Sequence, residues 1–126
     1  NFAHNTGEGG ISKYHLQHGG DLIWQIGTGY FGCRGADGNF SAEAFARNAV
    51  LDSVKMIELK ISQGAKPSHG GVLPGAKVST EIAEARGVPQ GETVYSPANH
   101  SEFSSPAGLL QFIARLRDLS GGKPVG

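Results

Sequence analysis

Apolar positions occur along the chain in short blocks, and their spacing alternates between that of strands and that of helices. Residues 21–26 form a run rich in β-branched and aromatic side chains, and Gly27 ends it. Residues 54–61 form a second, loosely alternating run that Gly64 bounds. Runs of this length between turn residues are typical of strands, so we predict a strand in each.

Three serines mark predicted helices, because a serine hydroxyl can accept a hydrogen bond from the first helical turn. Ser41 precedes apolar residues at helical spacing that continue to about residue 51. Ser79 precedes a shorter segment that Gly87 ends, and Ser105 precedes the longest amphipathic segment of the chain. We therefore predict a helix directly after each of these serines.

The order of these segments predicts an α/β fold. Residues 93–95 add a minor strand, and residues 123–125 look like the start of another. Alternating strands and helices indicate right-handed βαβ units and a parallel sheet. The loops that leave the strands are long and rich in glycine, whereas the helix-to-strand connection at residues 52–53 is short. In (β/α)8 TIM barrels the strand-to-helix loops build the active site, and such barrels typically need about 250 residues. We expect residues 1–126 to be a partial TIM barrel that is cut at both ends.

Composition narrows the expected partners and the compartment. The chain carries 11 basic and 11 acidic residues, so its net charge favours neither nucleic acid nor anionic lipid as a partner. No run is long enough to span a membrane and no segment resembles a signal peptide, so we expect a cytoplasmic protein. The lone Cys33 can form no internal disulfide and cannot hold an iron–sulfur cluster by itself. The 20 glycines gather in a few stretches, which indicates permissive loops between rigid elements.

Residues 27–32 match the pattern G-x-G-x-x-G directly after a predicted strand. A dinucleotide-binding fingerprint needs a helix that begins at the third glycine, but residues 33–38 have a turn sequence. Two interpretations remain beside that one. The glycines permit a bend at the end of the strand, or they let a planar ligand approach Gln25 and Thr28.

Two further glycine-rich loops carry charged side chains. Lys66 follows the second strand by a few residues, where an ammonium group can hold a substrate carboxylate or stabilise negative charge on a reduced ring. A solvated loop lysine is the alternative, because most lysines are exposed. Glu8 lies among glycines in residues 5–10 and either accepts a hydrogen bond from a substrate amine, positions its loop or is an exposed acid.

The histidines allow a metal site or acid catalysis but do not require either. His15 and His18 are spaced i, i+3, but no cysteine or carboxylate cluster completes a tetrahedral site near them, so we expect no metal. His69 and His100 each lie in a loop that leaves a strand. A general acid and a plain hydrogen-bonding side chain are both compatible with that position.

Four motifs follow one another in the chain at residues 5–10, 25–32, 63–75 and 96–97. They resemble the patterns S-N-T-G-E-G-G, Q-V-A-S-G-R-F-G, Q-G-A-K-P-G-E-G-G-Q-L-P-G and S-P-P-P-H-H of the FMN-binding barrel domain of glutamate synthases and glutamate synthase-related proteins. The third motif is the most specific of the four. The resemblance extends over nearly the whole chain and identifies residues 1–126 as the N-terminal portion of such a barrel.

This resemblance implies an FMN-dependent oxidoreductase that acts on CH–NH2 groups. In the family, 2-oxoglutarate and ammonia condense to 2-iminoglutarate, which takes a hydride from reduced flavin to give L-glutamate. The resemblance implies that Gln25, Thr28 and Gly29 face the flavin. It also implies that the FMN-phosphate loop and the ligands of an iron–sulfur cluster lie outside this chain, so we expect the isolated fragment to be inactive.

The resemblance assigns the substrate to the lysine loop. Lys66, with Gln63 and His69, is implied to bind the dicarboxylate, and Glu8 is implied to lie in the glycine loop at the barrel mouth. Lys66 and Glu8 are the expected catalytic residues. A cation there would both bind a 2-oxo acid and polarise its imine.

Three positions depart from the family patterns. Tyr30 stands where the pattern has arginine, His69 where it has glutamate, and the proline–histidine run is shortened at residues 97–100. The chain is therefore nearer to the glutamate synthase-related group. Its substrate is expected to be 2-oxoglutarate or a related 2-oxo acid, with ammonia or an amine as the nitrogen donor.

A second hypothesis is a non-catalytic half-barrel that pairs with another chain. Open strand edges and uncovered apolar faces make self-association of the fragment expected on either hypothesis. Flavin absorbance and the residues that follow Gly126 discriminate between the two.

We predict that Lys66→Ala in the complete protein abolishes turnover without release of FMN, because the ammonium binds the substrate rather than the flavin. Steady-state kinetics and flavin absorbance of the purified variant test this. Retained activity would refute the substrate-binding role.

Overall fold

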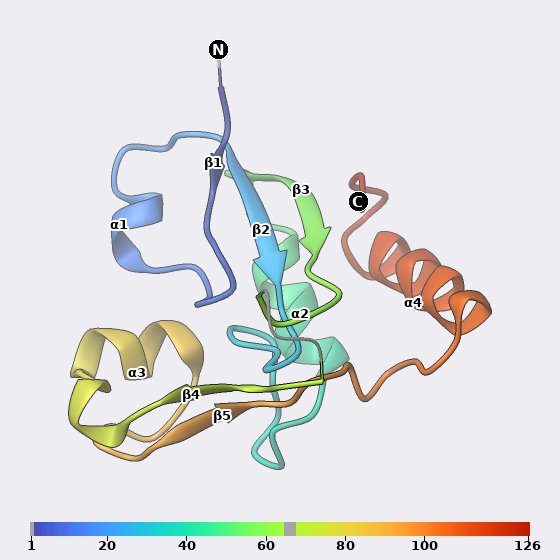
Figure 1. The fold of residues 1–126 in the computed structure, drawn as a ribbon. Coiled ribbons are helices and arrows are strands. Elements are labelled where there is room, and N and C mark those ends of the chain that lie inside the picture. The colour runs from blue at the N-terminus through green and yellow to red at the C-terminus, as the bar shows by residue number, and fades with distance from the viewer. Residues whose placement is uncertain (1, 65–67) are drawn as a thin grey trace.

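A computed structural model of the chain describes residues 2–64 and 68–126. Its central element is a parallel sheet with the order β1 (His4–Asn5), β2 (Leu22–Ile26), β3 (Val54–Leu59). Val125 pairs in parallel with Ile57 on the far side of β3. Each strand thus lies beside the next one in the sequence, as βαβ units require (Figure 1). Both predicted strands and the predicted start of a further one are confirmed.

The helices predicted after the three serines are also confirmed. They are α2 (Ala42–Ala49), α3 (Thr80–Arg86) and α4 (Pro106–Leu119). The hydroxyl oxygens of Ser41, Ser79 and Ser105 accept hydrogen bonds at 3.2, 3.4 and 3.1 Å from the backbone N–H three residues further on. Gly87 ends α3 in the left-handed conformation, with φ of +68°.

Two short elements near the N-terminus lie outside the sequence-based prediction. β1 consists of two polar residues, and it is a strand only because β2 pairs with it: His4 N–H donates to Asp21 O at 2.8 Å. α1 (Lys13–Leu16) is a single turn, stabilised where Ser12 N–H donates to His15 Nδ1 at 2.9 Å. Neither element is long enough to show a period of apolar residues.

The predicted minor strand is confirmed, but its partner corrects the expectation that the glycine-rich segment after the second predicted strand is only a loop. β5 (Val94–Ser96) pairs antiparallel with β4 (Gly71–Leu73), which a 3-10 turn, η1 (Gly75–Lys77), follows. Gly70 permits this approach, since a Cβ atom there would overlap the carbonyl oxygen of Ser96. Pairing between segments about two dozen residues apart leaves no local signal in the sequence.

One face of the parallel sheet is covered by helices. The alternate β2 side chains Leu22, Trp24 and Ile26 are buried. Figure 1 shows α2 behind the strand β2. Phe45 of α2 stacks on Trp24 with ring centroids 5.4 Å apart, and Phe112 of α4 joins the same cluster. A second cluster of buried side chains joins α3 to β5 and comprises Phe31, Val78, Ala83 and Val94.

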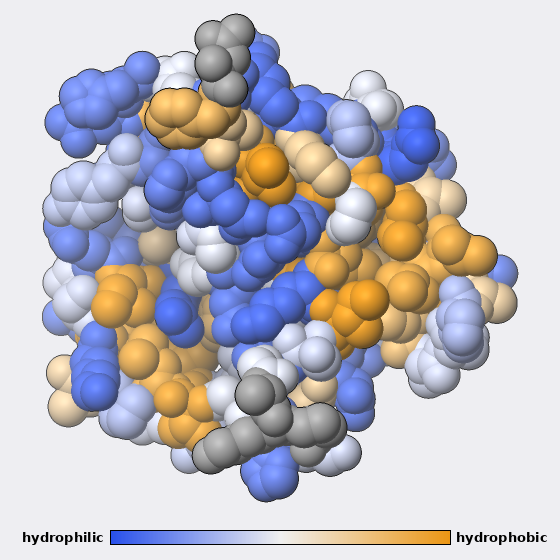
Figure 2. All heavy atoms as spheres, turned by 45° about the horizontal axis from the view of Figure 1, so that its top comes forward, coloured by the Kyte–Doolittle hydropathy of each residue, from blue (hydrophilic) through white to orange (hydrophobic). Residues whose placement is uncertain are grey.

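The opposite face of the sheet is open. Ile23 and Gln25 alternate with the buried β2 residues and are only half-buried. Across the middle of the molecule, hydrophilic side chains form a band flanked by apolar surface (Figure 2).

The chain is therefore an α/β protein with a parallel sheet of three strands. A (β/α)8 barrel stays a prediction. Within residues 2–64 and 68–126, no helix combines the length and apolar character needed to cross a bilayer.

We predict that Phe45→Ala lowers the free energy of unfolding by about 3–5 kcal/mol, because it leaves a cavity against Trp24. Val50→Ala is the matched control: this side chain at the end of α2 is 57% exposed, and its loss should cost no more than about 0.5 kcal/mol. Denaturant unfolding measures both. Equal effects of the two substitutions would show that the α2 contact does not stabilise the sheet.

Candidate functional site

Polar side chains from three successive strand ends meet at one edge of the parallel sheet. β2 and β3 both run toward the β4–β5 pair (Figure 1), so the segments that leave them lie at the same edge. In parallel α/β sheets this carboxyl edge is where ligands bind. Glu8 follows β1, Thr28 follows β2, and Lys60 and Gln63 follow β3. We call these four residues the strand-exit cluster.

Gln63 and Glu8 hold the strand-exit cluster together. The Gln63 side-chain NH2 donates to Glu8 Oε2 and to Thr28 Oγ1, each at 2.8 Å. Lys60 Nζ lies 3.3 Å from the other oxygen, Glu8 Oε1. Lys60 and Glu8 keep 31% and 26% of their side-chain surface exposed, so their ion pair is partly shielded from solvent. The structure thus brings together three residues that the sequence singled out, Glu8, Thr28 and Gln63, and adds Lys60.

Thr28 lies beneath this edge rather than at the surface. Its side chain is 1% exposed, and its hydroxyl donates to Pro97 O at 2.6 Å while accepting from Gln63. Gly29 is packed as closely, because a Cβ atom there would lie 2.8 Å from the Phe31 ring. Both residues therefore support the edge, and their proposed contact with a ligand stays a prediction.

Gln25 lies on the open face of β2, just before the strand ends. Its side-chain NH2 donates to Glu58 Oε1 at 2.6 Å. Asn5 donates to the other oxygen of the same carboxylate, also at 2.6 Å. The backbone N–H of Gln25 donates to Thr6 Oγ1 at 3.1 Å, which ties β2 to the loop that carries Glu8.

Arg86, the last residue of α3, adds a cation beside the strand-exit cluster. Its guanidinium carbon lies 4.5 Å from the centroid of the Phe31 ring. Burial lowers the pKa of Arg86, and the nearby Glu8 carboxylate opposes this shift. Within the described part of the chain, the guanidinium forms no hydrogen bond or ion pair. Arg86 and Glu8 line a hollow of about 170 Å³ together with Gly71, Val72, Leu73, Val94 and Ser96.

The predicted lysine loop carries two more residues that the sequence singled out. Lys66 lies outside the described residues. His69 is among the described residues and is exposed. Their roles stay predictions.

The whole chain, residues 1–126, matches the family described as "Conserved region in glutamate synthase". The chain belongs to the glutamate synthase family. It is 52% identical over 122 residues to the glutamate synthase large subunit-like protein YerD of Bacillus subtilis, covering 97% of this chain and 23% of that protein.

Two further glutamate synthase relatives are more distant. The archaeal-type glutamate synthase [NADPH] of Thermotoga maritima is 38% identical over 97% of this chain and 22% of its own length. The archaeal glutamate synthase [NADPH] of Methanocaldococcus jannaschii is 36% identical over 94% of this chain and 21% of its own length. The chain thus spans between a fifth and a quarter of these relatives.

In this member of the glutamate synthase family, the residue that replaces the arginine of the family pattern is turned into the core. Tyr30 is 1% exposed and has a left-handed backbone, with φ of +50°. Its hydroxyl lies 3.0 Å from His100 Nδ1. His100 Nε2 lies 2.8 Å from Lys60 O, which only accepts, so Nε2 carries the proton and Nδ1 accepts from Tyr30. Both ring nitrogens are engaged, which favours the structural interpretation of His100 over a general acid.

The G-x-G-x-x-G segment of this chain, residues 27–32, forms turns rather than a helix start. No helix begins at Gly32 in the described chain, and α2 starts only at Ala42. The dinucleotide interpretation of residues 27–32 is therefore excluded, and the bend at the end of β2 is confirmed.

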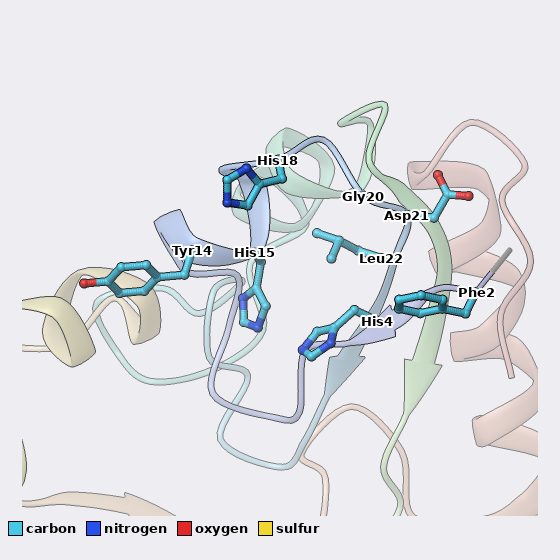
Figure 3. A pocket seen from close by; sticks show the side chains of 8 residues that line it. All are labelled: Phe2, His4, Tyr14, His15, His18, Gly20, Asp21 and Leu22. Atoms are coloured by element: carbon cyan, nitrogen blue, oxygen red, sulfur yellow. The ribbon is translucent and has the colours of Figure 1, made fainter.

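A larger hollow of this glutamate synthase-family chain lies elsewhere, at the start of the strands. It measures about 730 Å³ and is lined by residues that include His4, His15 and His18 (Figure 3). The rings of His4 and His15 are 5.3 Å apart, and burial together with His4 lowers the pKa of His15. Among the described residues, no group of three histidine, cysteine or acidic side chains is arranged to hold a metal ion.

Sequence reasoning missed Lys60, Glu58 and Arg86. Lys60 and Glu58 were detectable, because both lie at the end of the strand whose exit loop was already singled out. Arg86 was not, since a basic residue in the last turn of a helix is ordinarily explained by the helix dipole.

We predict that His100 makes stability depend on pH. Burial lowers the pKa of His100 in the folded state, so the folded protein binds fewer protons than the unfolded one, whose histidine pKa is about 6.5. The part of the folding stability that depends on a neutral His100 is therefore present in full above that pH, and it is lost as the pH falls below it. Denaturant unfolding between about pH 7.5 and pH 5 should show a steeper loss for the wild type than for His100→Gln. Parallel curves would contradict this assignment.

Proposed function

We propose that this chain forms the first strands of an FMN-dependent glutamate synthase-type (β/α)8 barrel. The complete protein would reduce an imine of 2-oxoglutarate, or of a related 2-oxo acid, to the corresponding amino acid. The observation that carries the proposal is that Lys60 and Gln63 both contact Glu8 at the carboxyl edge of a parallel sheet, where Glu8 and Arg86 line one hollow. Membership of the family and the names of the relatives, glutamate synthases among them, support it.

The side chains at this edge fit one side of a flavin ring. Gln25 donates one amide hydrogen to Glu58, which leaves its other amide hydrogen and its carbonyl oxygen without a partner among the described residues. A free N–H beside a free C=O complements the alternating C=O and N–H groups of the flavin pyrimidine edge. Lys60 supplies a partly buried cation for the negative charge of the reduced ring. FMN, when bound, supplies the hydride that adds to the imine carbon.

Charge at the same edge suits an acidic substrate. The Lys60 ammonium pairs with the Glu8 carboxylate, whereas the Arg86 guanidinium has no ion pair among the described residues and can therefore pair with an anion. Its five N–H groups match a carboxylate, and partial burial strengthens the attraction. Arg86 therefore binds a carboxylate of the 2-oxo acid in this proposal, and Lys66 polarises the imine from the neighbouring loop.

Gln63 and Glu8 orient these groups. Because Gln63 bridges Glu8 and Thr28, it fixes the carboxylate with one oxygen toward Lys60. Glu8 thereby holds the Lys60 ammonium in place and keeps the cation from folding toward solvent.

The test uses the full-length protein. It should purify with oxidised flavin absorbance and reduce a 2-oxo acid in the presence of ammonia. Arg86→Met should raise the KM for the 2-oxo acid by about ten- to a hundredfold, the cost of one lost charge-assisted hydrogen bond, with flavin absorbance unchanged. Arg117→Met, at an exposed position on α4, is the matched control. A protein without flavin, or an unchanged KM in Arg86→Met, would overturn the proposal.

A further inference from the structure

The Glu58 carboxylate, on the open face of the sheet, holds two parts of the candidate site. Its contact with Gln25 is called the Gln25 arm, and its contact through Asn5 with the loop that carries Glu8 is called the loop arm. Glu58 lies on β3 directly beside Gln25 of β2 in the strand register. Asn5 reaches the same carboxylate from β1, across β2. The two amides occupy both oxygens of Glu58, each at 2.6 Å, so one side chain links three strands.

This arrangement has a fixed hydrogen-bonding polarity. An ionised carboxylate only accepts, so both amides must turn their NH2 groups toward Glu58 and their carbonyl oxygens away from it. The carbonyl oxygen of Asn5 accepts from Gly7 N–H at 2.9 Å. The carbonyl oxygen of Gln25 accepts from none of the described residues and lies on the open face. Reversal of either amide would place a carbonyl oxygen against a carboxylate.

We propose that Glu58 is a positioning residue that sets this polarity for the flavin-facing edge. Through Gln25 it presents a carbonyl acceptor and one free N–H to the ligand. Through Asn5 and Gly7 it holds the loop whose next residue, Glu8, anchors the strand-exit cluster. The Gln25 arm rests on the proposed function, because it needs a bound flavin. The loop arm does not, because it involves only residues of the protein.

The loop arm connects Glu58 on β3 to Glu8, which lies on the far side of β2. Asn5 and Gly7 are joined by a hydrogen bond, and the Thr6 hydroxyl donates to Gly7 O at 2.8 Å while it accepts from the Gln25 N–H. Loss of the Glu58 charge releases Asn5, and Gly7 then loses its acceptor.

The test replaces Glu58 in the full-length protein by its neutral isostere. Glu58→Gln places an NH2 group opposite one of the two amides, which must then turn over. We expect a shifted flavin absorption maximum and midpoint potential from the Gln25 arm. From the loop arm we expect hydrogen exchange at Gly7 to become about tenfold faster, the effect of one lost hydrogen bond. Glu92→Gln, at an exposed position between α3 and β5, is the matched control and should change neither readout.

A double variant distinguishes the direction of the hydrogen bonds at position 58 from a general loss of protein stability. It combines Asn5→Asp with Glu58→Gln. The new amide on β3 then accepts from Gln25 through its carbonyl oxygen and donates through its NH2 group to the new carboxylate on β1, which also accepts from Gly7 N–H. Every hydrogen bond is restored and the net charge is conserved, so flavin properties and Gly7 exchange should return to wild-type values. If the double variant behaves like Glu58→Gln, the charge at position 58 matters and polarity does not.

The outcomes distinguish this proposal from the proposed function. Unchanged flavin properties and unchanged Gly7 exchange in Glu58→Gln would overturn the positioning role although flavin is bound. If the wild-type protein carries no flavin, the proposed function and the Gln25 arm both fail. Accelerated exchange at Gly7 in Glu58→Gln, and its reversal in the double variant, still decide the loop arm.

Discussion

The parallel pairing of β2 with β3 determines where the polar side chains of the site lie. Gln25 stands beside Glu58 and Ile26 beside Leu59, so both strands end at the same level. A shift by one residue would exchange the two faces of β3, moving Glu58 into the apolar cluster and Ile57 to the open face. Burial of alternate side chains against α2 and α4 makes that shift unfavourable, and so the apolar core fixes the position of residues it does not contact.

The two faces of this sheet are stabilised by different kinds of interaction. On the covered face, aromatic packing such as that between Trp24 and Phe45 provides stability without polar specificity. On the open face and at the carboxyl edge, short hydrogen bonds connect amides and carboxylates from separate strands or from the segments that follow them. These groups stay partly solvated, so they contribute orientation more than stability.

Sequence reasoning reached the features that local chemistry determines. The serine caps, the two main strands and the end of α3 at Gly87 each depend on residues within one turn or one strand, and all are confirmed. Glu8, Thr28 and Gln63 were singled out from motifs, and the structure brings them together. Their partners were not accessible in this way. The bond between Gln63 and Glu8 joins residues 55 positions apart, and β4 is a strand only because β5 lies beside it.

Tyr30 and His100 bear on how the family arginine came to be replaced. The Tyr30 hydroxyl is the donor for an imidazole nitrogen that is buried with it, and Phe103 stacks on the other side of that imidazole. Arginine alone at position 30 would place a guanidinium where a neutral ring now packs and would leave His100 without its donor. The two positions are therefore coupled in this protein: a return to arginine at position 30 requires a second change that supplies His100 with a new donor or removes its need for one.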